Sequence, residues 1–174
     1  MPDFAREKIL HLLRALNDEL RRMKVRGELN LAGGAVMCLA FEARDSTKDV
    51  DAAFVPSVQV KEAALRVSEN EGVPDSWLND AVKIYLSDRG SFNPFLDLSH
   101  LKVFVADARY MLAMKCLAMR TGEGFRDEED IRYLLRNLGL ESYEGAQRIL
   151  AAYYELDSYP KRALAALREL LPNP

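Results

Sequence analysis

The sequence predicts an α/β (α+β) fold in which a small mixed sheet is flanked by helices and is followed by a helical C-terminal part. Three observations lead to this class. Apolar residues recur at helical spacing through residues 3–25, a strand–turn–helix–strand unit follows within residues 28–55, and only helices are expected from residue 107 onward. The chain therefore combines a sheet-forming first part with an all-helical end.

The elements follow from local patterns along the chain. Leu29 and Leu31 indicate a short strand, and the strand after it is expected to turn Val50, Ala52 and Phe54 into the core. The other expected elements are a helix at 58–71, a helix or strand around 77–86, a loop at 87–94, a strand at 101–105, and helices near 107–120, 127–138, 142–155 and 159–171. With no internal repeat or flexible linker, we expect one domain, 1–174, with an α/β core at 1–105 and a helical lobe at 106–174.

Composition narrows the class of protein. At 174 residues, 49% hydrophobic and 29% charged, the chain can bury a sizeable core and shows no disorder bias. It has no apolar run near the roughly 20 residues of a membrane span, so no membrane partner is expected. A net charge of −3 argues against general DNA binding. Cys38 and Cys116 lie in apolar helices without a C-x-x-C pattern, and charged residues interrupt any secretory signal, which together predict a cytoplasmic protein with reduced thiols.

Two carboxylates stand at strand spacing in Asp49-Val-Asp51. Residues i and i+2 of a strand share a face, so Asp49 and Asp51 are expected about 6–7 Å apart at their Cα atoms. Their carboxylates can then converge on Mg²⁺, although such a pair is also common as simple surface decoration.

A glycine pair precedes the carboxylates. Gly33 and Gly34 lie between a short strand and the helix that begins at Ala35, where backbone amides become accessible to phosphate oxygens. Glycine allows both tight turning and close approach of a ligand, but a Gly-Gly pair is often only a turn. The glycine pair is more informative here because it lies in the same short strand–helix–strand unit as Asp49 and Asp51. The glycines and carboxylates together favour a site for a metal-bound nucleotide.

Polar residues just before the carboxylates are candidate nucleotide-binding groups. The Arg44 guanidinium and the hydroxyls of Ser46 and Thr47 are donors suited to a triphosphate. A polar loop also requires no such role.

At these residues the chain resembles the nucleotidyltransferase superfamily, whose motif is a GG or GS turn at a helix start followed by D-h-D on the next strand. A closer resemblance is to minimal bacterial nucleotidyltransferase-like proteins related to the AbiEii toxins. It spans about residues 29–140 and also includes Trp77-Leu-Asn-Asp80, Val105-Ala-Asp107, Met114-Lys115-Cys-Leu-Ala118, Arg120 and Arg126-Asp127-Glu-Glu-Asp130-Ile131. The resemblance implies transfer of NMP from an NTP to an RNA or protein acceptor, with Mg²⁺ held by the carboxylates. It also suggests the toxin of a bacterial toxin–antitoxin pair, with an antitoxin protein as partner.

A complete site in this superfamily usually has a third carboxylate on a neighbouring strand, where it activates the acceptor hydroxyl. The expected strand at 101–105 carries no acid, and Asp97 is the nearest candidate for a third metal ligand. Asp107 is expected to cap the following helix.

A single cation interrupts the apolar helix near 107–120. Either the stem of Lys115 packs while its ammonium reaches solvent, or the ammonium points toward a phosphate or carboxylate in a cleft. Asp127 is expected to cap the next helix, whereas Asp130 is the better site candidate. In a functional alternative, one of these two residues pairs with Lys115 or approaches the nucleotide. Asp49, Asp51, Lys115 and Asp130 are thus the candidate catalytic residues.

Two functions remain open at this point. One is a Mg²⁺-dependent nucleotidyltransferase. The other is a noncatalytic nucleotide-binding or protein-binding module that keeps the fold and the Asp49/Asp51 pair without the acid that activates the acceptor.

Overall fold

The computed structural model describes residues 3–120 and 126–171 and confirms a mixed α/β fold. The chain divides into two compact units. The first unit comprises Met1–Ile84 and Phe92–Ala106, and the second comprises Tyr85–Ser91 and Asp107–Pro174. The division falls one residue after the expected end of the α/β core, and the second unit also includes the short segment that precedes Phe92.

A five-stranded mixed sheet of order β5-β4-β2-β7-β6 forms the centre of the first unit. Its strands are β2 (Gly27–Ala32), β4 (Val50–Val55), β5 (Leu78–Asn79), β6 (Phe92–Asp97) and β7 (Leu101–Ala106). Strand β2 pairs parallel with β7 and antiparallel with β4, while β4 pairs parallel with β5. Strands β1 (Phe4–Ala5) and β3 (Ser46–Thr47) form a separate antiparallel pair.

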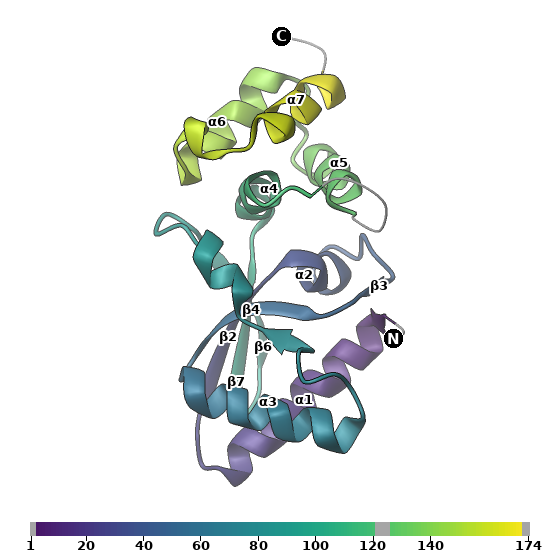
Figure 1. Ribbon diagram of the computed structural model, residues 1–174, viewed down its shortest axis with the longest axis vertical. Coiled ribbons are helices and arrows are strands. Elements are labelled where there is room, and N and C mark those ends of the chain that lie inside the picture. The colour runs from purple at the N-terminus through teal and green to yellow at the C-terminus, as the bar shows by residue number, and fades with distance from the viewer. Residues whose placement is uncertain (1–2, 121–125, 172–174) are drawn as a thin grey trace. The chain divides into compact units, whose positions relative to one another are not determined.

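Helices α1 (Arg6–Arg22) and α3 (Ser57–Glu71) pack together against one face of this sheet (Figure 1). Gly27 of β2 shows that both helices cover the same face. A Cβ atom there would lie 2.9 Å from Leu20 Cδ1 of α1 and 3.3 Å from Val60 Cγ2 of α3. The core lies in this layer, and the prediction that Val50, Ala52 and Phe54 point into it is confirmed, because all three are buried.

The opposite face of the sheet carries Asp51 and Ala53 of β4. Asn30 of β2 pairs with Ala53 on one side and with Phe104 of β7 on the other. All four side chains are half-buried, in contrast to the fully buried layer under α1 and α3. Asp51 therefore lies on the more accessible face.

Element boundaries differ from the expectations at several places. The helix after β2 is α2 (Gly33–Leu39), which begins at Gly33 and not at Ala35, so the two glycines belong to the helix. The first helix begins at Arg6, because Phe4 and Ala5 pair with β3 instead. The region around 77–86 contains both β5 and a 3₁₀ helix, η1 (Ala81–Tyr85). The expected loop at 87–94 ends earlier, since β6 begins at Phe92 and includes Pro94. Proline is tolerated there because β6 is an edge strand.

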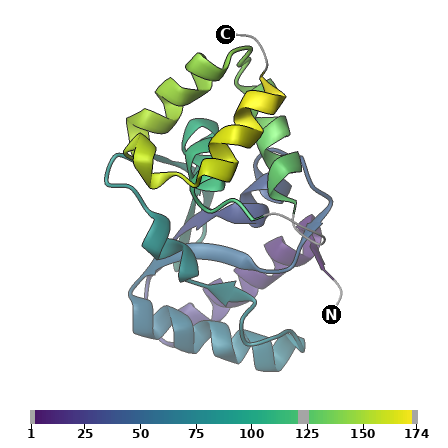
Figure 2. The same ribbon diagram turned by 45° about the horizontal axis from the view of Figure 1, so that its top comes forward.

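The second unit is helical, as predicted for the C-terminal part. It contains α4 (Ala108–Leu117), α5 (Asp127–Asn137), α6 (Tyr143–Tyr153), the 3₁₀ helix η2 (Leu156–Ser158) and α7 (Lys161–Leu170). Figure 2 shows α6 and α7, in light green and yellow, packed beside each other. Asp107 caps α4 as predicted, because its Oδ1 accepts a hydrogen bond from the Tyr110 backbone N–H at 2.8 Å.

The segment Tyr85–Ser91 is fastened to the helices of the second unit by hydrogen bonds. The Ser87 backbone N–H donates to the Tyr110 hydroxyl at 2.7 Å, and Ser87 Oγ donates to the Tyr153 carbonyl at 2.6 Å. Gly90 packs so closely that an added Cβ would lie 1.9 Å from the Tyr110 ring.

Across residues 3–120 and 126–171, no helix combines the length and the apolar character that a membrane crossing requires.

Candidate functional site

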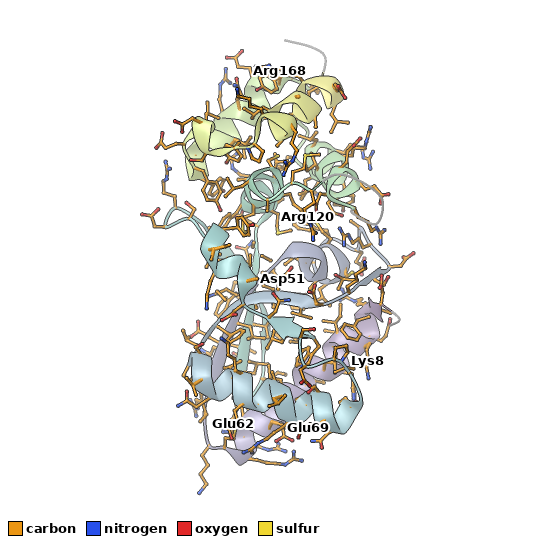
Figure 3. All side chains as sticks on the ribbon, in the orientation of Figure 1. Lys8, Asp51, Glu62, Glu69, Arg120 and Arg168 are labelled. Atoms are coloured by element: carbon orange, nitrogen blue, oxygen red, sulfur yellow. The ribbon has the colours of Figure 1, made fainter. Side chains whose placement is uncertain are left out.

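The two predicted metal ligands lie at the start of β4. Asp51 is the second residue of the strand, and Asp49 immediately precedes the strand. Both side chains are half-buried, whereas Val50 between them is fully buried, as expected for alternating positions. Figure 3 labels Asp51, whose position on β4 pairs with Ala32, the last residue of β2.

Helix α2 begins directly after β2, and its first residue, Gly33, packs on Asp51. Gly33 has a φ of +66°, and a Cβ atom at this position would lie 2.5 Å from Asp51 Oδ2. Only glycine meets both conditions, because another residue would have a strained backbone and would collide with the carboxylate. The structure thus brings Gly33 and Asp51 together, as the combined motif requires.

Gly34 lies against two more of the predicted residues. A Cβ atom on Gly34 would lie 2.5 Å from Thr47 Oγ1 and 2.7 Å from Arg44 Nη1. Thr47 is buried and donates a hydrogen bond to the Asp49 carbonyl at 3.3 Å. The two glycines, one hydroxyl, one guanidinium and two carboxylates form one cluster, which we call the glycine–carboxylate cluster: Gly33, Gly34, Arg44, Thr47, Asp49 and Asp51.

Ser46 is not part of this cluster. It precedes Thr47 on β3, so the two side chains point in opposite directions. The Ser46 hydroxyl donates to Asp3 Oδ2 at 3.3 Å, near the exposed start of the described chain.

Asn79 joins the cluster although no site role was predicted for it. It pairs with Asp51 in the register of β4 and β5, and its Nδ2 donates to Asp49 Oδ2 at 2.9 Å. The sequence contains it within Trp77-Leu-Asn-Asp80, but the parallel pairing of a two-residue strand leaves no periodic signal that could have placed it beside Asp49.

The prediction that Asp97 supplies a third metal ligand is wrong. Asp97 pairs with Lys102, Lys102 pairs with Glu28, and Glu28 pairs with Val55. Val55 lies four residues beyond Asp51 on β4, a distance of about 13 Å along the strand. Asp97 therefore lies at the other end of the sheet, too far away to share an ion with Asp51.

No other acid takes the place of Asp97 on the neighbouring strand. On the face that carries Asp51, β7 presents Lys102 and Phe104, followed by Ala106. Within the described part of the chain, no group of three or more His, Cys, Asp or Glu residues is arranged to hold a metal ion. The donor set of two hard carboxylates still fits Mg²⁺, which commonly takes one or two protein carboxylates and completes its shell with substrate phosphates and water.

Lys115, Asp127 and Asp130 form a second cluster, within the helical unit. Lys115 Nζ lies 2.8 Å from Asp130 Oδ2 and 3.3 Å from Asp127 Oδ1, and all three residues are buried. The alternative in which the Lys115 ammonium reaches solvent is therefore wrong. We call these three residues the buried charge cluster.

Arg120 completes the contacts of Asp127. Its backbone N–H and its Nε both donate to Asp127 Oδ2, at 2.8 and 3.2 Å. Burial raises the pKa of Asp127, but the positive charges of Lys115 and Arg120 and the two Arg120 hydrogen bonds outweigh it, and the net shift is downward. The prediction that Asp127 is the N-cap of α5 is wrong, because Arg126 is the N-cap and the Asp127 carboxylate turns toward α4 and Arg120 instead. Asp130 lies in the first turn, as expected.

The four predicted catalytic residues thus occupy two clusters, with Asp49 and Asp51 in the first unit and Lys115 and Asp130 in the second.

A scan against family models found no match to this chain, and neither did searches of curated proteins and of solved structures.

Proposed function

We propose that the protein is a Mg²⁺-dependent nucleotidyltransferase that moves NMP from an NTP to an RNA or protein acceptor. The observation that carries this proposal is the packing of Gly33 on Asp51, where an added Cβ would lie 2.5 Å from the carboxylate. Gly33 and Asp51, which are separated in the sequence, lie against each other, and this packing supports the proposal.

The cluster offers complementary groups for a metal-bound triphosphate. Asp49 and Asp51 would hold Mg²⁺ together with phosphate oxygens, and the bound ion would stabilise charge on the oxygens of the reacting phosphate. The Arg44 guanidinium and the Thr47 hydroxyl lie beside Gly34, where they can donate hydrogen bonds to phosphate oxygens. Because glycine has no side chain, the Asp51 carboxylate, the Thr47 hydroxyl and the Arg44 guanidinium can lie directly against the backbone of Gly33 and Gly34.

Other parts of the proposal have narrower support. The catalytic roles of Lys115 and Asp130 and the role as a toxin with a cognate antitoxin come from the resemblance alone. The contacts of Lys115 within the buried charge cluster explain its burial without any ligand.

Calorimetric titration of each of the four NTPs, with and without Mg²⁺, tests the proposal. We expect Mg²⁺-dependent binding by the wild type and its loss in the Asp49→Asn/Asp51→Asn variant. Asp97→Asn is a matched control, since it removes a carboxylate from the other end of the same sheet and should leave binding intact. Circular dichroism verifies that each variant is folded. Unchanged binding by the folded double variant would refute the assignment of the site.

One observation favours the noncatalytic alternative. The face of β7 nearest Asp51 ends in Phe104 and Ala106, so that strand provides no acid to activate an acceptor hydroxyl. The two functions are separated by incubating the protein with the labelled NTP that binds best, together with candidate RNA and protein acceptors. Transfer of label that requires Asp49 and Asp51 supports the enzyme, whereas tight binding without transfer supports a binding module.

A further inference from the structure

The Asn79 amide makes two hydrogen bonds with opposite roles. Its Oδ1 accepts from the Ala81 backbone N–H at 3.3 Å, at the start of η1. Its Nδ2 donates to Asp49 Oδ2 at 2.9 Å. The amide oxygen thus contacts the nearby backbone, and the amide nitrogen contacts the glycine–carboxylate cluster.

The backbone around Asn79 is fixed on the side of β4. Asn79 pairs with Asp51, and the Val50 backbone N–H donates to the Trp77 carbonyl at 2.7 Å. Trp77 itself is buried, and its Nε1 donates to the Ala64 carbonyl at 2.9 Å. The amide of Asn79 is therefore presented to Asp49 from a well-anchored strand.

Asp49 and Asp51 differ in their backbone pairing. Asp51 lies within β4 and is paired on both sides, with Ala32 and with Asn79, whereas Asp49 precedes the strand. A carboxylate that must bind an ion is commonly oriented by a hydrogen bond from a neighbouring group, and loss of that group weakens metal binding.

We propose that Asn79 is a positioning residue that orients the Asp49 carboxylate for binding a divalent cation. This inference rests on the proposed metal site of the nucleotidyltransferase. A carboxylate has about four acceptor positions on its two oxygens, so the hydrogen bond from Asn79 does not by itself prevent Asp49 from binding an ion. A neutral amide suits this role because a lysine would compete with the cation for Asp49, and an acid would repel the carboxylate.

A purely structural role for Asn79 would act through Ala81 instead. Asn79→Ser separates the two roles, since a serine hydroxyl can still accept from a backbone N–H two residues onward but is too short to reach Asp49. Asn79→Ala is measured as a second variant. If one of the two variants fails to fold, the other still reports on cation binding. Asn30→Ser is the matched control, because Asn30 lies on the same sheet face but pairs with Ala53 and Phe104.

Tb³⁺ is the probe, because it is a hard cation that binds oxygen ligands and emits when a nearby tryptophan is excited. Trp77, the one tryptophan of the chain, lies two residues before Asn79 and is suited to sensitise it. The affinity is measured from sensitised emission, with displacement by Mg²⁺ as a check. The number of coordinated waters is measured from emission lifetimes in H₂O and D₂O.

We expect Asn79→Ser to weaken Tb³⁺ binding by about 10- to 100-fold and to change the number of coordinated waters, with little change in melting temperature. Asn30→Ser should leave the affinity unchanged. If Asn79 acts through Asp49, adding Asn79→Ser to Asp49→Asn should cause little further loss.

The outcomes distinguish this inference from the function on which it rests. Wild-type binding that Asn79→Ser and Asn79→Ala leave unchanged overturns the positioning role but keeps the metal site. Equal losses from Asn79→Ser in the wild-type and Asp49→Asn backgrounds also overturn it, because the effect would not pass through Asp49. Failure of the wild type to bind Tb³⁺ removes the metal site and this inference together.

Discussion

Replacing Lys115 by methionine should strongly destabilise the helical unit. Methionine keeps most of the apolar stem but removes the ammonium that contacts both buried carboxylates, those of Asp127 and Asp130. For unit charges at the observed 2.8 and 3.3 Å, an effective dielectric constant of about 20 gives attractions of about 6 and 5 kcal/mol. Dehydration of the buried ions opposes much of this attraction.

The net effect follows from what the variant leaves behind. Two carboxylates would remain buried, and the Arg120 side chain that contacts Asp127 is 60% exposed. Removing one partner of a buried ion pair typically costs about 3–5 kcal/mol, and we expect Lys115→Met to fall in that range. Lys161→Met is the matched control, because Lys161 is exposed on α7 of the same unit, and its substitution should change stability by less than about 0.5 kcal/mol.

Hydrogen exchange followed by mass spectrometry is the appropriate assay. Trp77 belongs to the first unit, so tryptophan fluorescence does not report on the helical unit. Amides of α4 and α5 should exchange much faster in Lys115→Met than in Lys161→Met. Equal protection in the two variants would refute the reasoning. Nucleotide affinity is measured on the same samples. If the amides of α4 and α5 lose their protection while nucleotide affinity stays unchanged, Lys115 has a structural role only.

Three further predictions follow from single residues. The pKa of Asp127 is lower in the folded than in the unfolded state, so its ionisation stabilises the fold above the unfolded-state pKa of about 3.9. This stabilisation is lost as the pH falls through the lower folded-state pKa. The stability of the helical unit should therefore depend less steeply on acid pH in Asp127→Asn. Gly33→Ala should abolish NTP binding and lower the melting temperature by more than Gly72→Ala does. Gly72 has the same φ of +66°, but a Cβ atom added there would meet no atom within 4 Å. Equal losses of melting temperature would contradict the close packing of Gly33 on Asp51. Burial raises the pKa of the Cys116 thiol to about 12, so it should react with a thiol reagent at pH 8 only when urea unfolds the protein, and fast labelling of the folded chain would contradict this.

The sequence predicted those features that depend on short-range patterns. The alternation of apolar residues along the strand predicted that Val50, Ala52 and Phe54 point into the core. The same alternation predicted that Asp49 and Asp51 point away from this core, and both are half-buried. A capping aspartate, Asp107, was also found, since its hydrogen bond spans only three residues. Each of these features is decided within one element or at its end.

The remaining features depend on strand register and on contacts between elements. Asp97 lies close to β7 in the sequence, but the antiparallel turn between β6 and β7 places it at the wrong end of the sheet. Asn79 reaches Asp49 only through the pairing of β5 with β4, thirty residues apart in sequence. Asp127 has the position of a helix cap, yet hydrogen bonds from Lys115 and Arg120 determine its orientation. Local periodicity contains no information on such long-range choices.

The segment Tyr85–Ser91 has a practical consequence for dissecting the protein. The chain passes between the two units after Ile84, after Ser91 and after Ala106, so neither unit is a continuous piece of the sequence. A fragment beginning at Asp107 would lack Ser87, which contacts both the Tyr110 hydroxyl and the Tyr153 carbonyl. A fragment ending at Ala106 would retain that segment without its helical partners. A protein that contained one complete unit would need its two segments joined by a new connection. Truncation alone cannot produce such a protein, because each unit consists of two separate segments of the chain.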